Sequence, residues 1–212
     1  IFDELTPIPI EECLGREPVP PIKELLNKGI NNKSVCIIGA GGSIGSELSR
    51  QIVKLNPKRI VIFEINEPSL YYIYEELKSI TKGLIEINSI LGSALNFSLL
   101  KDTFKQYDVE IVFHAAAYKH VPLVEKNPLE GITNNIISTL RICQACIDCK
   151  LSNMILISTD KAVRPSNVMG ASKRFAELIV QNFSETQFSD NKENLSIRNT
   201  CFSIVRFGNV LN

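Results

Sequence analysis

Residues 34–45 read SVCIIGAGGSIG and decide the fold. An apolar run leads into Gly39, and glycines then recur at every third position until a helical pattern begins. A buried parallel strand that turns sharply into a helix needs such glycines for three reasons: the turn itself, close approach of the backbone to a pyrophosphate, and close packing of the helix on the strand. The pyrophosphate would lie at the positive end of the helix dipole. We therefore expect a dinucleotide to contact Gly39, Gly42, Ser43, Ile44 and Gly45.

A second buried strand is expected at residues 59–64, and Glu64 closes it about 20 residues beyond the glycines. A carboxylate at this place accepts hydrogen bonds from the adenosine ribose hydroxyls and repels a 2′-phosphate, which favours NAD over NADP. Taken singly, the two features would be an ordinary strand-to-helix turn and a solvated strand end. Their order along the chain makes a dinucleotide site the stronger interpretation.

The composition narrows the classes of function. A chain of 212 residues makes one domain or a little more and buries a real core. Its 23 basic and 23 acidic residues balance, so charge gives no argument for a nucleic-acid partner or an anionic membrane surface. No apolar stretch approaches the ~18 residues that span a bilayer, and no signal peptide is visible. Because residue 1 is Ile, we expect a piece of a longer protein.

Three of the six cysteines, Cys143, Cys146 and Cys149, form a CxxCxxC run that suggests a zinc or cluster site. They fall within residues 128–150, which read as one long helix. At about 100° per residue the first and third thiols point about 120° apart, so the three cannot converge on one ion. We therefore expect no metal here. Reduced thiols fit a cytoplasmic compartment.

Strands and helices alternate beyond the glycine turn. Residues 1–33 read as an N-terminal arm with a short helical stretch, and residues 34–212 as the dinucleotide-binding domain. Such alternation predicts a Rossmann-type α/β fold, a doubly wound parallel sheet with helices on both faces. Residues 181–200 are polar, lack a period and read as a surface loop. The expected strands are 34–39, 59–64, 84–90, 110–114, 153–158 and 202–207, with helices beginning near Ser43, Pro68, Leu95, Pro128 and Val168.

In such sheets ligands bind at the carboxyl ends of the strands. Strand four is followed by three alanines, over which a flat ring can lie, and then by Lys119 and His120, which would face an anionic or hydroxylated substrate. His114, just before the alanines, is more typical of a core or loop histidine. The three alanines, which we expect to contact the cofactor, are Ala115, Ala116 and Ala117.

Strand five ends in a hydroxyl, an acid and an amine: Thr159, Asp160 and Lys161. In isolation this group would be a helix cap beside a surface ion pair. Lys173 lies further along on an expected helix, and Met169 is one turn before it on the same face. These residues would place side chains that can transfer protons at the edge of the sheet where we expect the ligand to bind.

Five stretches carry a family resemblance: CLGREPV, GAGGSIGSEL, HAAAYKHVP, ISTDKAVRPSNVMGASKR and RFGNV. Together they cover nearly the whole chain, and TDKAV followed by NVMGASK is specific. The chain resembles the extended short-chain dehydrogenase/reductase superfamily and, within it, is similar to the UDP-N-acetylglucosamine 4,6-dehydratases of the polysaccharide-biosynthesis group. GREPV points to the long members with N-terminal membrane helices. This implies a homo-oligomeric, cytoplasmic enzyme attached to the cytoplasmic face of the inner membrane through a region that precedes this chain.

Two positions depart from the superfamily pattern. The usual Tyr-x-x-x-Lys begins here with Met169, and a thioether has no proton to transfer. Long members of the dehydratase group resemble this chain in having Met there, so the change does not imply inactivity. The usual Gly-Asp after strand three, which contacts adenine, reads Gly92-Ser93, so Ser93 replaces an acid at that contact.

The resemblance implies an internally redox-neutral reaction. NAD takes a hydride from sugar carbon 4, the hydrogen on carbon 5 and the hydroxyl on carbon 6 leave, and the hydride returns to carbon 6. Thr159 would bind the carbon-4 hydroxyl and Lys173 the nicotinamide ribose. Asp160 would be the general acid at carbon 6, which requires burial that raises its pKa. Lys161 would be the base at carbon 5, with a pKa lowered by neighbouring cations, and by our hypothesis it also takes the proton of the carbon-4 hydroxyl.

The resemblance also implies a UDP-N-acetylhexosamine substrate, bound by Lys119, His120, Arg206 and Asn209. Most of the family's sugar-nucleotide-binding part comes after residues 206–209, so it is largely absent from this chain, which we expect to bind dinucleotide but to turn over poorly. Two alternatives remain open: a 5-inverting dehydratase or 4-epimerase of the same fold, and a non-catalytic dinucleotide-binding domain. Met169 argues against the epimerase and favours the non-catalytic domain.

Overall fold

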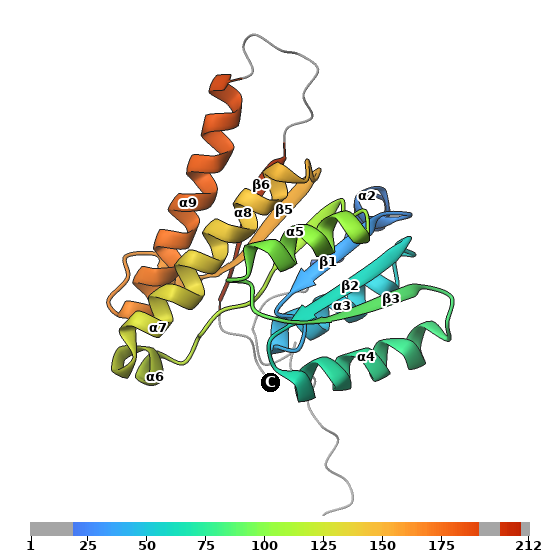
Figure 1. The fold of residues 1–212 in the computed structure, drawn as a ribbon, viewed down its shortest axis with the longest axis horizontal. Coiled ribbons are helices and arrows are strands. Elements are labelled where there is room, and N and C mark those ends of the chain that lie inside the picture. The colour runs from blue at the N-terminus through green and yellow to red at the C-terminus, as the bar shows by residue number, and fades with distance from the viewer. Residues whose placement is uncertain (1–18, 191–199, 209–212) are drawn as a thin grey trace, which may run out of the picture.

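The strands form one parallel sheet (Figure 1). The computed structural model describes residues 19–190 and 200–208. Within this part of the chain the sheet has six strands in the order β3-β2-β1-β4-β5-β6, and each pair of neighbours is parallel. The strands are β1 (Ser34–Ile38), β2 (Arg59–Glu64), β3 (Glu86–Leu91), β4 (Ile111–His114), β5 (Asn153–Thr159) and β6 (Cys201–Phe207).

The strand order reverses beside β1. From there the chain proceeds outward through β2 to β3, and then returns to add β4, β5 and β6 on the other side. Ile38, the last residue of β1, is paired with Phe63 of β2 and with His114 of β4. Connections that leave neighbouring strands in opposite directions open a crevice at their carboxyl ends, and this is where the site lies.

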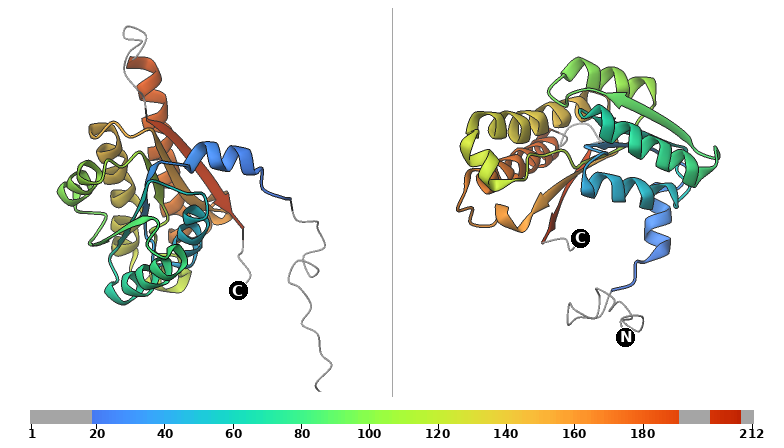
Figure 2. Two further views of the ribbon diagram at one scale, coloured as in Figure 1. Left: turned by 90° about the vertical axis from the view of Figure 1, so that its right-hand side faces the viewer. Right: turned by 90° about the horizontal axis from the view of Figure 1, so that it is seen from below.

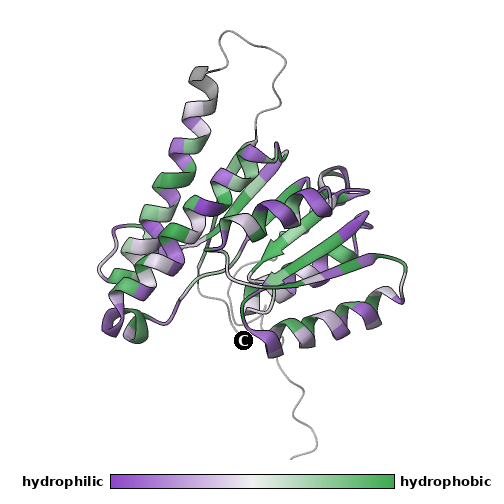
Figure 3. Ribbon diagram, in the orientation of Figure 1, coloured by the Kyte–Doolittle hydropathy of each residue, from purple (hydrophilic) through white to green (hydrophobic). Residues whose placement is uncertain are grey.

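Helices cover both faces of the sheet, as the view from below in Figure 2 shows. The side chains of β1 alternate between two cores: Cys36 and Ile38 join one, and Val35 and Ile37 join the other. Because both faces are buried, the central strands are apolar along their length, which Figure 3 shows in green. The first core packs on α5 (Phe97–Gln106), α8 (Ser138–Asp148) and α9 (Val168–Asp190), and the second on α3 (Ser43–Val53) and α4 (Glu67–Thr81). The predicted Rossmann-type fold is confirmed.

The helix predicted at 128–150 is not one uniform α-helix. It consists of α7 (Pro128–Ile132), a π-helical turn η1 (Thr133–Ile137) and α8, which ends at Asp148. A short helix that the sequence did not predict, α6 (Val121–Lys126), precedes it. Cys143 is fully buried in the first core, and burial raises the pKa of its thiol to about 12.

The predicted loop at 181–200 was wrong for residues 181–190, where α9 continues to Asp190. Phe183 on this part of α9 packs against Phe202 of β6, with ring centroids 5.9 Å apart. The polar sequence hides this tertiary contact, which favours the helix over a loop. Residues 191–199 lie outside the described part. The other predicted bounds agree with the observed ones to within two residues.

The short helix expected near the end of the N-terminal arm is confirmed as α2 (Lys23–Ile30). The rest of the arm up to residue 18, including Cys13, lies outside the described residues. Over the ranges 19–190 and 200–208, no helix combines the length and apolar character needed to cross a bilayer. In the same ranges, no three His, Cys, Asp or Glu side chains are grouped as metal ligands.

Candidate functional site

The turn between β1 and α3 has the tight geometry that its glycines predict. Gly39 has φ +83°, a region that favours glycine, and a Cβ there would come within 2.5 Å of the Ala116 amide nitrogen. A Cβ at Gly45 would overlap the carbonyl oxygen of Gly39, so helix and strand pack without room for a side chain. Gly42 precedes the helix, and no side chain caps its first turn. These features leave backbone amides at the start of α3 for an anionic ligand.

Lys119 reaches this helix terminus from the loop after β4. Its Nζ lies 3.4 Å from the Ser43 hydroxyl oxygen. An ammonium group beside a helix N-terminus makes the place doubly attractive for a phosphate. The sequence predicts that Lys119 contacts the sugar nucleotide, and in the structure its ammonium group also lies next to the glycine turn.

Glu64 at the end of β2 is a buried carboxylate that binds backbone amides. It accepts hydrogen bonds from Gly41 N at 2.9 Å, from Ile65 N at 2.9 Å and from Asn66 N at 3.0 Å. The side chain therefore ties the glycine turn to the tip of β2, a role that the sequence did not predict. A carboxylate accepts up to four hydrogen bonds, so it retains capacity for the predicted ribose contact.

Ser93 lies at the tip of β3, beside β2. Its hydroxyl accepts a hydrogen bond from Leu95 N at 3.2 Å, and the preceding Gly92 donates its amide to the Glu64 carbonyl at 2.9 Å. The predicted adenine and ribose contacts therefore lie on adjoining strand ends, on the outer side of the glycine turn.

The loop after β4 is held by Asn135 of the π-helical turn. The Asn135 side chain accepts from Tyr118 N at 2.8 Å and donates to Tyr118 O at 3.1 Å. It also donates to the Ser172 hydroxyl on α9 at 2.9 Å. The Asn135 side chain, which the sequence did not predict as part of the site, connects the loop after β4 to α9.

His114 is a core histidine, as expected. Its Nε2 lies 3.0 Å from the Thr139 hydroxyl, while Nδ1 is buried with no partner among the described residues. Burial, and secondarily the charge of Lys173, lower the pKa of His114 to about 3. The imidazole is therefore neutral at physiological pH, and it is not among the described residues that line the hollows of the site.

The tip of β5 passes directly into a 3-10 turn, η2 (Asp160–Ala162). The Thr159 hydroxyl donates to Asp160 Oδ1 at 2.9 Å, and Lys161 Nζ lies 3.6 Å from the same oxygen. The Asp160 side chain is 54% exposed. The hydrogen bond from Thr159, followed by the charge of Lys161, lowers the pKa of Asp160. The burial and raised pKa expected of a general acid are therefore absent from this arrangement.

Helix α9 brings Met169 and Lys173 to the same crevice. Both are buried, and Lys173 Nζ donates to the Ile157 carbonyl of β5 at 2.7 Å. Burial lowers the pKa of Lys173 to about 8, and the nearby Glu177 carboxylate opposes that shift. A Cβ at Gly170 would overlap the Lys161 carbonyl oxygen, so the first turn of α9 lies directly on η2.

A hollow of about 300 Å³ brings these parts together. It connects the start of α3 with the β5 tip, so the crevice predicted between strands one and five exists. Asp160, Glu64 and Ser93 are not among the described residues that line it, and Asn209 lies outside the described part of the chain. Its lining includes Ser43, Ile44, Ala115, Ala117, Lys119, Thr159, Lys161, Met169, Lys173 and Phe207.

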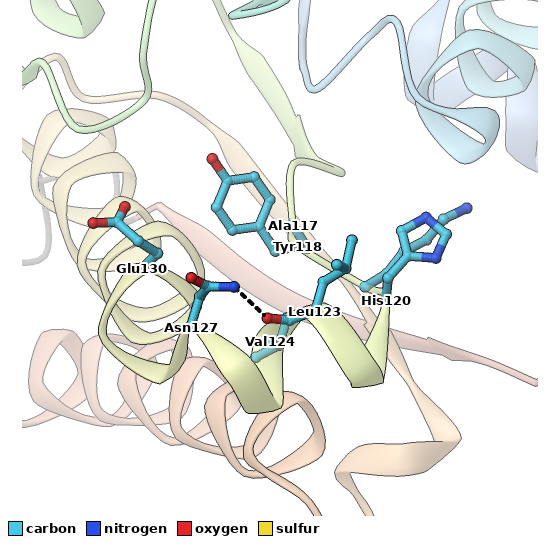
Figure 4. Close-up of a pocket in the computed structure, with 9 residues that line it drawn as sticks. Ala117, Tyr118, His120, Leu123, Val124, Asn127 and Glu130 are labelled. Carbon is cyan, nitrogen blue, oxygen red and sulfur yellow. Dashed lines mark hydrogen bonds between the residues drawn. The ribbon is translucent and has the colours of Figure 1, made fainter.

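A second hollow of about 410 Å³ adjoins the first and shares Ala117, Tyr118 and Lys119 with it. Figure 4 shows the Tyr118 ring above α6 and α7, with His120 on one side and Glu130 on the other. The predicted substrate residue His120 lines this hollow and not the first. The sequence predicts a substrate site on this loop, and it does not reveal that the loop borders two adjoining hollows.

Several curated proteins are similar to this chain. The capsular polysaccharide biosynthesis protein CapD of Staphylococcus aureus is 40% identical over 99% of the chain and 33% of its own length. An uncharacterized membrane protein of Methanocaldococcus jannaschii, MJ1061, is 41% identical over 85% of the chain and 50% of its length. A UDP-N-acetylglucosamine 4,6-dehydratase (inverting) of Campylobacter jejuni is 31% identical over the same shares. The chain thus spans between a third and a half of these relatives.

Solved structures give the same result for the fold. Pen from Bacillus thuringiensis superposes with a TM-score of 0.74 at 28% identity, over 86% of this chain and 54% of that one. DesIV of Streptomyces venezuelae, a dTDP-glucose 4,6-dehydratase with NAD bound, gives a TM-score of 0.66 at 16% identity, over 81% and 54%. The sequence model described as "Polysaccharide biosynthesis protein" matches residues 35–212. The chain therefore belongs to the polysaccharide biosynthesis protein family.

Proposed function

We propose that the chain is the dinucleotide-binding and catalytic part of an NAD-dependent 4,6-dehydratase of UDP-N-acetylglucosamine. The product would be a UDP-linked 4-keto-6-deoxy-N-acetylhexosamine for surface polysaccharide. The observation that carries the proposal is the single hollow that joins the start of α3 to Thr159, Lys161 and Lys173. Similarity to named 4,6-dehydratases supports the reaction class.

The residues present fit a dinucleotide. Gly39 and Gly45 pack where no side chain fits, the first turn of α3 lacks a side-chain cap, and Lys119 lies beside it. These residues would hold the pyrophosphate, and Glu64 would hold the adenosine ribose, which favours NAD over NADP. When bound, NAD supplies the acceptor that takes a hydride from sugar carbon 4 and later returns it to carbon 6.

The chain's own residues would orient the sugar and move its protons. Thr159 would hydrogen-bond the carbon-4 hydroxyl, and Lys173 would hold the nicotinamide ribose. Lys161 would accept the proton of the carbon-4 hydroxyl and pass it to Asp160, whose Oδ1 lies 3.6 Å from Nζ. Neutral again, Lys161 would remove the proton on carbon 5 and return a proton there once the hydride reaches carbon 6. Met169, a buried thioether with no titratable proton, would only form the wall of the site. Water leaves, and the hydride lost from carbon 4 returns to carbon 6 of the same sugar, so oxidation and reduction balance.

Asp160 would protonate the hydroxyl that leaves carbon 6. The hydrogen bond from Thr159 and the charge of Lys161 keep its pKa low, so the acid role requires a change on substrate binding. A sugar that takes the Thr159 hydrogen bond would remove the larger cause, and a sugar that covers the half-exposed carboxylate would raise the pKa further. The competition of the sugar with Asp160 for Thr159 is therefore part of the proposal.

We further propose that Lys119 and His120, with Arg206 and Asn209, contact the sugar nucleotide, and that the whole protein is a membrane-attached homo-oligomer facing the cytoplasm. Lys119 borders both hollows, which suits a diphosphate between them. Similarity to MJ1061, which carries the name of a membrane protein, supports the attachment. Fractionation of the full-length protein and its mass in detergent test these two points.

The deciding experiment incubates the full-length protein with UDP-N-acetylglucosamine and measures the mass of the sugar nucleotide over time. Loss of one water supports the dehydratase. A product of unchanged mass with an inverted carbon 4 would make it a 4-epimerase, and NMR in heavy water separates retention from inversion at carbon 5. NAD binding with no turnover would select a non-catalytic domain, which the thioether of Met169 favours.

A further inference from the structure

Glu177 on α9 is a fully buried carboxylate that sequence reasoning did not identify as part of the site. One of its oxygens accepts from the Ser158 hydroxyl at 2.7 Å and from Arg206 Nε at 2.7 Å. The other accepts from Arg206 Nη2 at 2.7 Å and from Arg174 Nη1 at 2.9 Å. Burial alone would raise the pKa of Glu177, but these hydrogen bonds outweigh it and lower the pKa to about 2.

The partners of this carboxylate come from three separate elements. Ser158 is on β5, Arg206 is paired with it in register on β6, and Arg174 is on α9 itself. A guanidinium that binds a carboxylate through two nitrogens fixes direction as well as distance. Glu177 therefore holds the ends of β5 and β6 and the first turns of α9 in one arrangement.

Each of these partners is next to a residue that lines the 300 Å³ hollow. Ser158 precedes Thr159, and Arg206 precedes Phe207. Lys173 lies one helical turn before Glu177, and its ammonium is bound to the carbonyl of Ile157 on β5. Any shift of the β5 tip relative to α9 would therefore move the hydroxyl and both amines of the site.

We propose that Glu177 is a positioning residue: through Ser158 and Arg206 it fixes the tips of β5 and β6 on α9. The inference rests on the proposed dehydration for its kinetic consequence. It also gives Arg206 a role inside the protein, as the partner of Glu177.

The Glu177 carboxylate also acts on the Lys173 ammonium by its charge. The neutral His114 on β4 lies close to Lys173, and Lys161 on η2 and Lys119 from the β4 loop line the same hollow. Loss of the Glu177 charge would leave the buried Lys173 ammonium without the carboxylate that stabilises it. Lys173 would then lose its proton at a lower pH, so the decline of NAD affinity with rising pH should begin earlier.

The test uses the full-length protein with three variants. Glu177→Gln keeps the size of the side chain but removes its charge. Arg174→Gln is the matched control, because it removes an exposed partner of the same carboxylate. The double variant Glu177→Gln/Arg206→Met removes both members of the pair, so the half-exposed arginine is not left without its carboxylate, and it guards against simple misfolding.

For Glu177→Gln we expect kcat to fall about 10- to 100-fold with little change in KM for the sugar nucleotide. We expect the double variant to remain as slow and Arg174→Gln to match the unaltered protein. A melting temperature that falls while kcat is unchanged would make Glu177 merely structural. Recovery of full kcat in the double variant would also overturn the inference.

NAD affinity measured by calorimetry across pH needs no turnover. In the unaltered protein it should decline as pH rises through about 8, the pKa of Lys173. In Glu177→Gln the midpoint should lie about one pH unit lower. An unchanged midpoint contradicts the inference even if the protein proves inactive, whereas a shifted midpoint with no water loss from UDP-N-acetylglucosamine rejects only the proposed function.

Discussion

The two ends of the crevice are built differently. At the glycine turn, backbone contacts too close for any side chain fix the geometry, and the buried Glu64 carboxylate holds the loop. At the β5 tip, half-exposed Asp160 and Lys161 face each other at 3.6 Å. The first end is rigid and suited to binding, while the second has charged side chains that can change partners. Binding and chemistry should therefore respond separately to substitution.

Gly45→Ala should have the largest effect. The added Cβ would overlap the Gly39 carbonyl oxygen, which is backbone and cannot move aside. We expect a destabilisation of about 3 kcal/mol or failure to fold, with loss of NAD binding, measured by denaturant unfolding and calorimetry. Gly29→Ala is the control, because nothing lies within 4 Å of its Cβ in α2, and it should be neutral or stabilising. Normal NAD affinity in Gly45→Ala would contradict the inference that the glycine turn is rigid.

Lys161→Ala should impair the chemistry at the β5 tip and leave NAD binding at the glycine turn intact. We expect kcat for water loss to fall about 10²- to 10⁴-fold while NAD affinity stays within about twofold, because Lys161 lies away from the glycine turn. Stopped-flow absorbance of the reduced nicotinamide would show whether the first hydride transfer is lost. Lys105→Ala, at an exposed position of α5, is the matched control. An equal loss of binding and rate in Lys161→Ala would mean that the two ends are not separable.

The dependence of stability on acid pH sharpens the comparison further, because the β5 tip is held by ion pairs whose carboxylate, Glu177, is fully buried. The pKa of Glu177 is lowered to about 2 in the folded protein, so the unfolded chain binds its proton first as pH falls. Its contribution to stability is therefore complete above about pH 4.5 and declines towards pH 2. Urea unfolding should show a slope of stability against pH in this window that is shallower in Glu177→Gln by up to ~1.4 kcal/mol per pH unit. Equal slopes of stability against pH in the unaltered protein and in Glu177→Gln would contradict the pairing of Glu177 with the arginines.

Met169→Leu should have the smallest effect. Leucine matches methionine in volume, so the wall of the hollow is kept, and we expect a stability loss below about 1.5 kcal/mol. If the thioether has no chemical part, kcat should stay within a fewfold of the unaltered protein. A steady-state assay that gives a much larger loss would show that sulfur itself contributes.

The sequence predicts the binding end better than the chemical end. The glycine spacing and Glu64 obey local backbone rules that operate within one βαβ unit. The partners of Glu177 come from β5, α9 and β6, so no local pattern reports their meeting. The exposure of Asp160 likewise depends on how η2 turns after β5, which composition does not reveal. The length of α9 was missed because Phe183 needs Phe202, a residue beyond the expected loop, to bury its ring.

The π-helical turn at Thr133–Ile137 restricts the length of the chain between α7 and α8. An extra residue in this turn rotates α8 relative to α7, so α7 can line a hollow while α8 faces the sheet. Removing a single residue there would restore uniform winding and turn Asn135 away from the Tyr118 peptide. The segment between Pro128 and Cys143 should therefore tolerate substitutions far better than insertions or deletions.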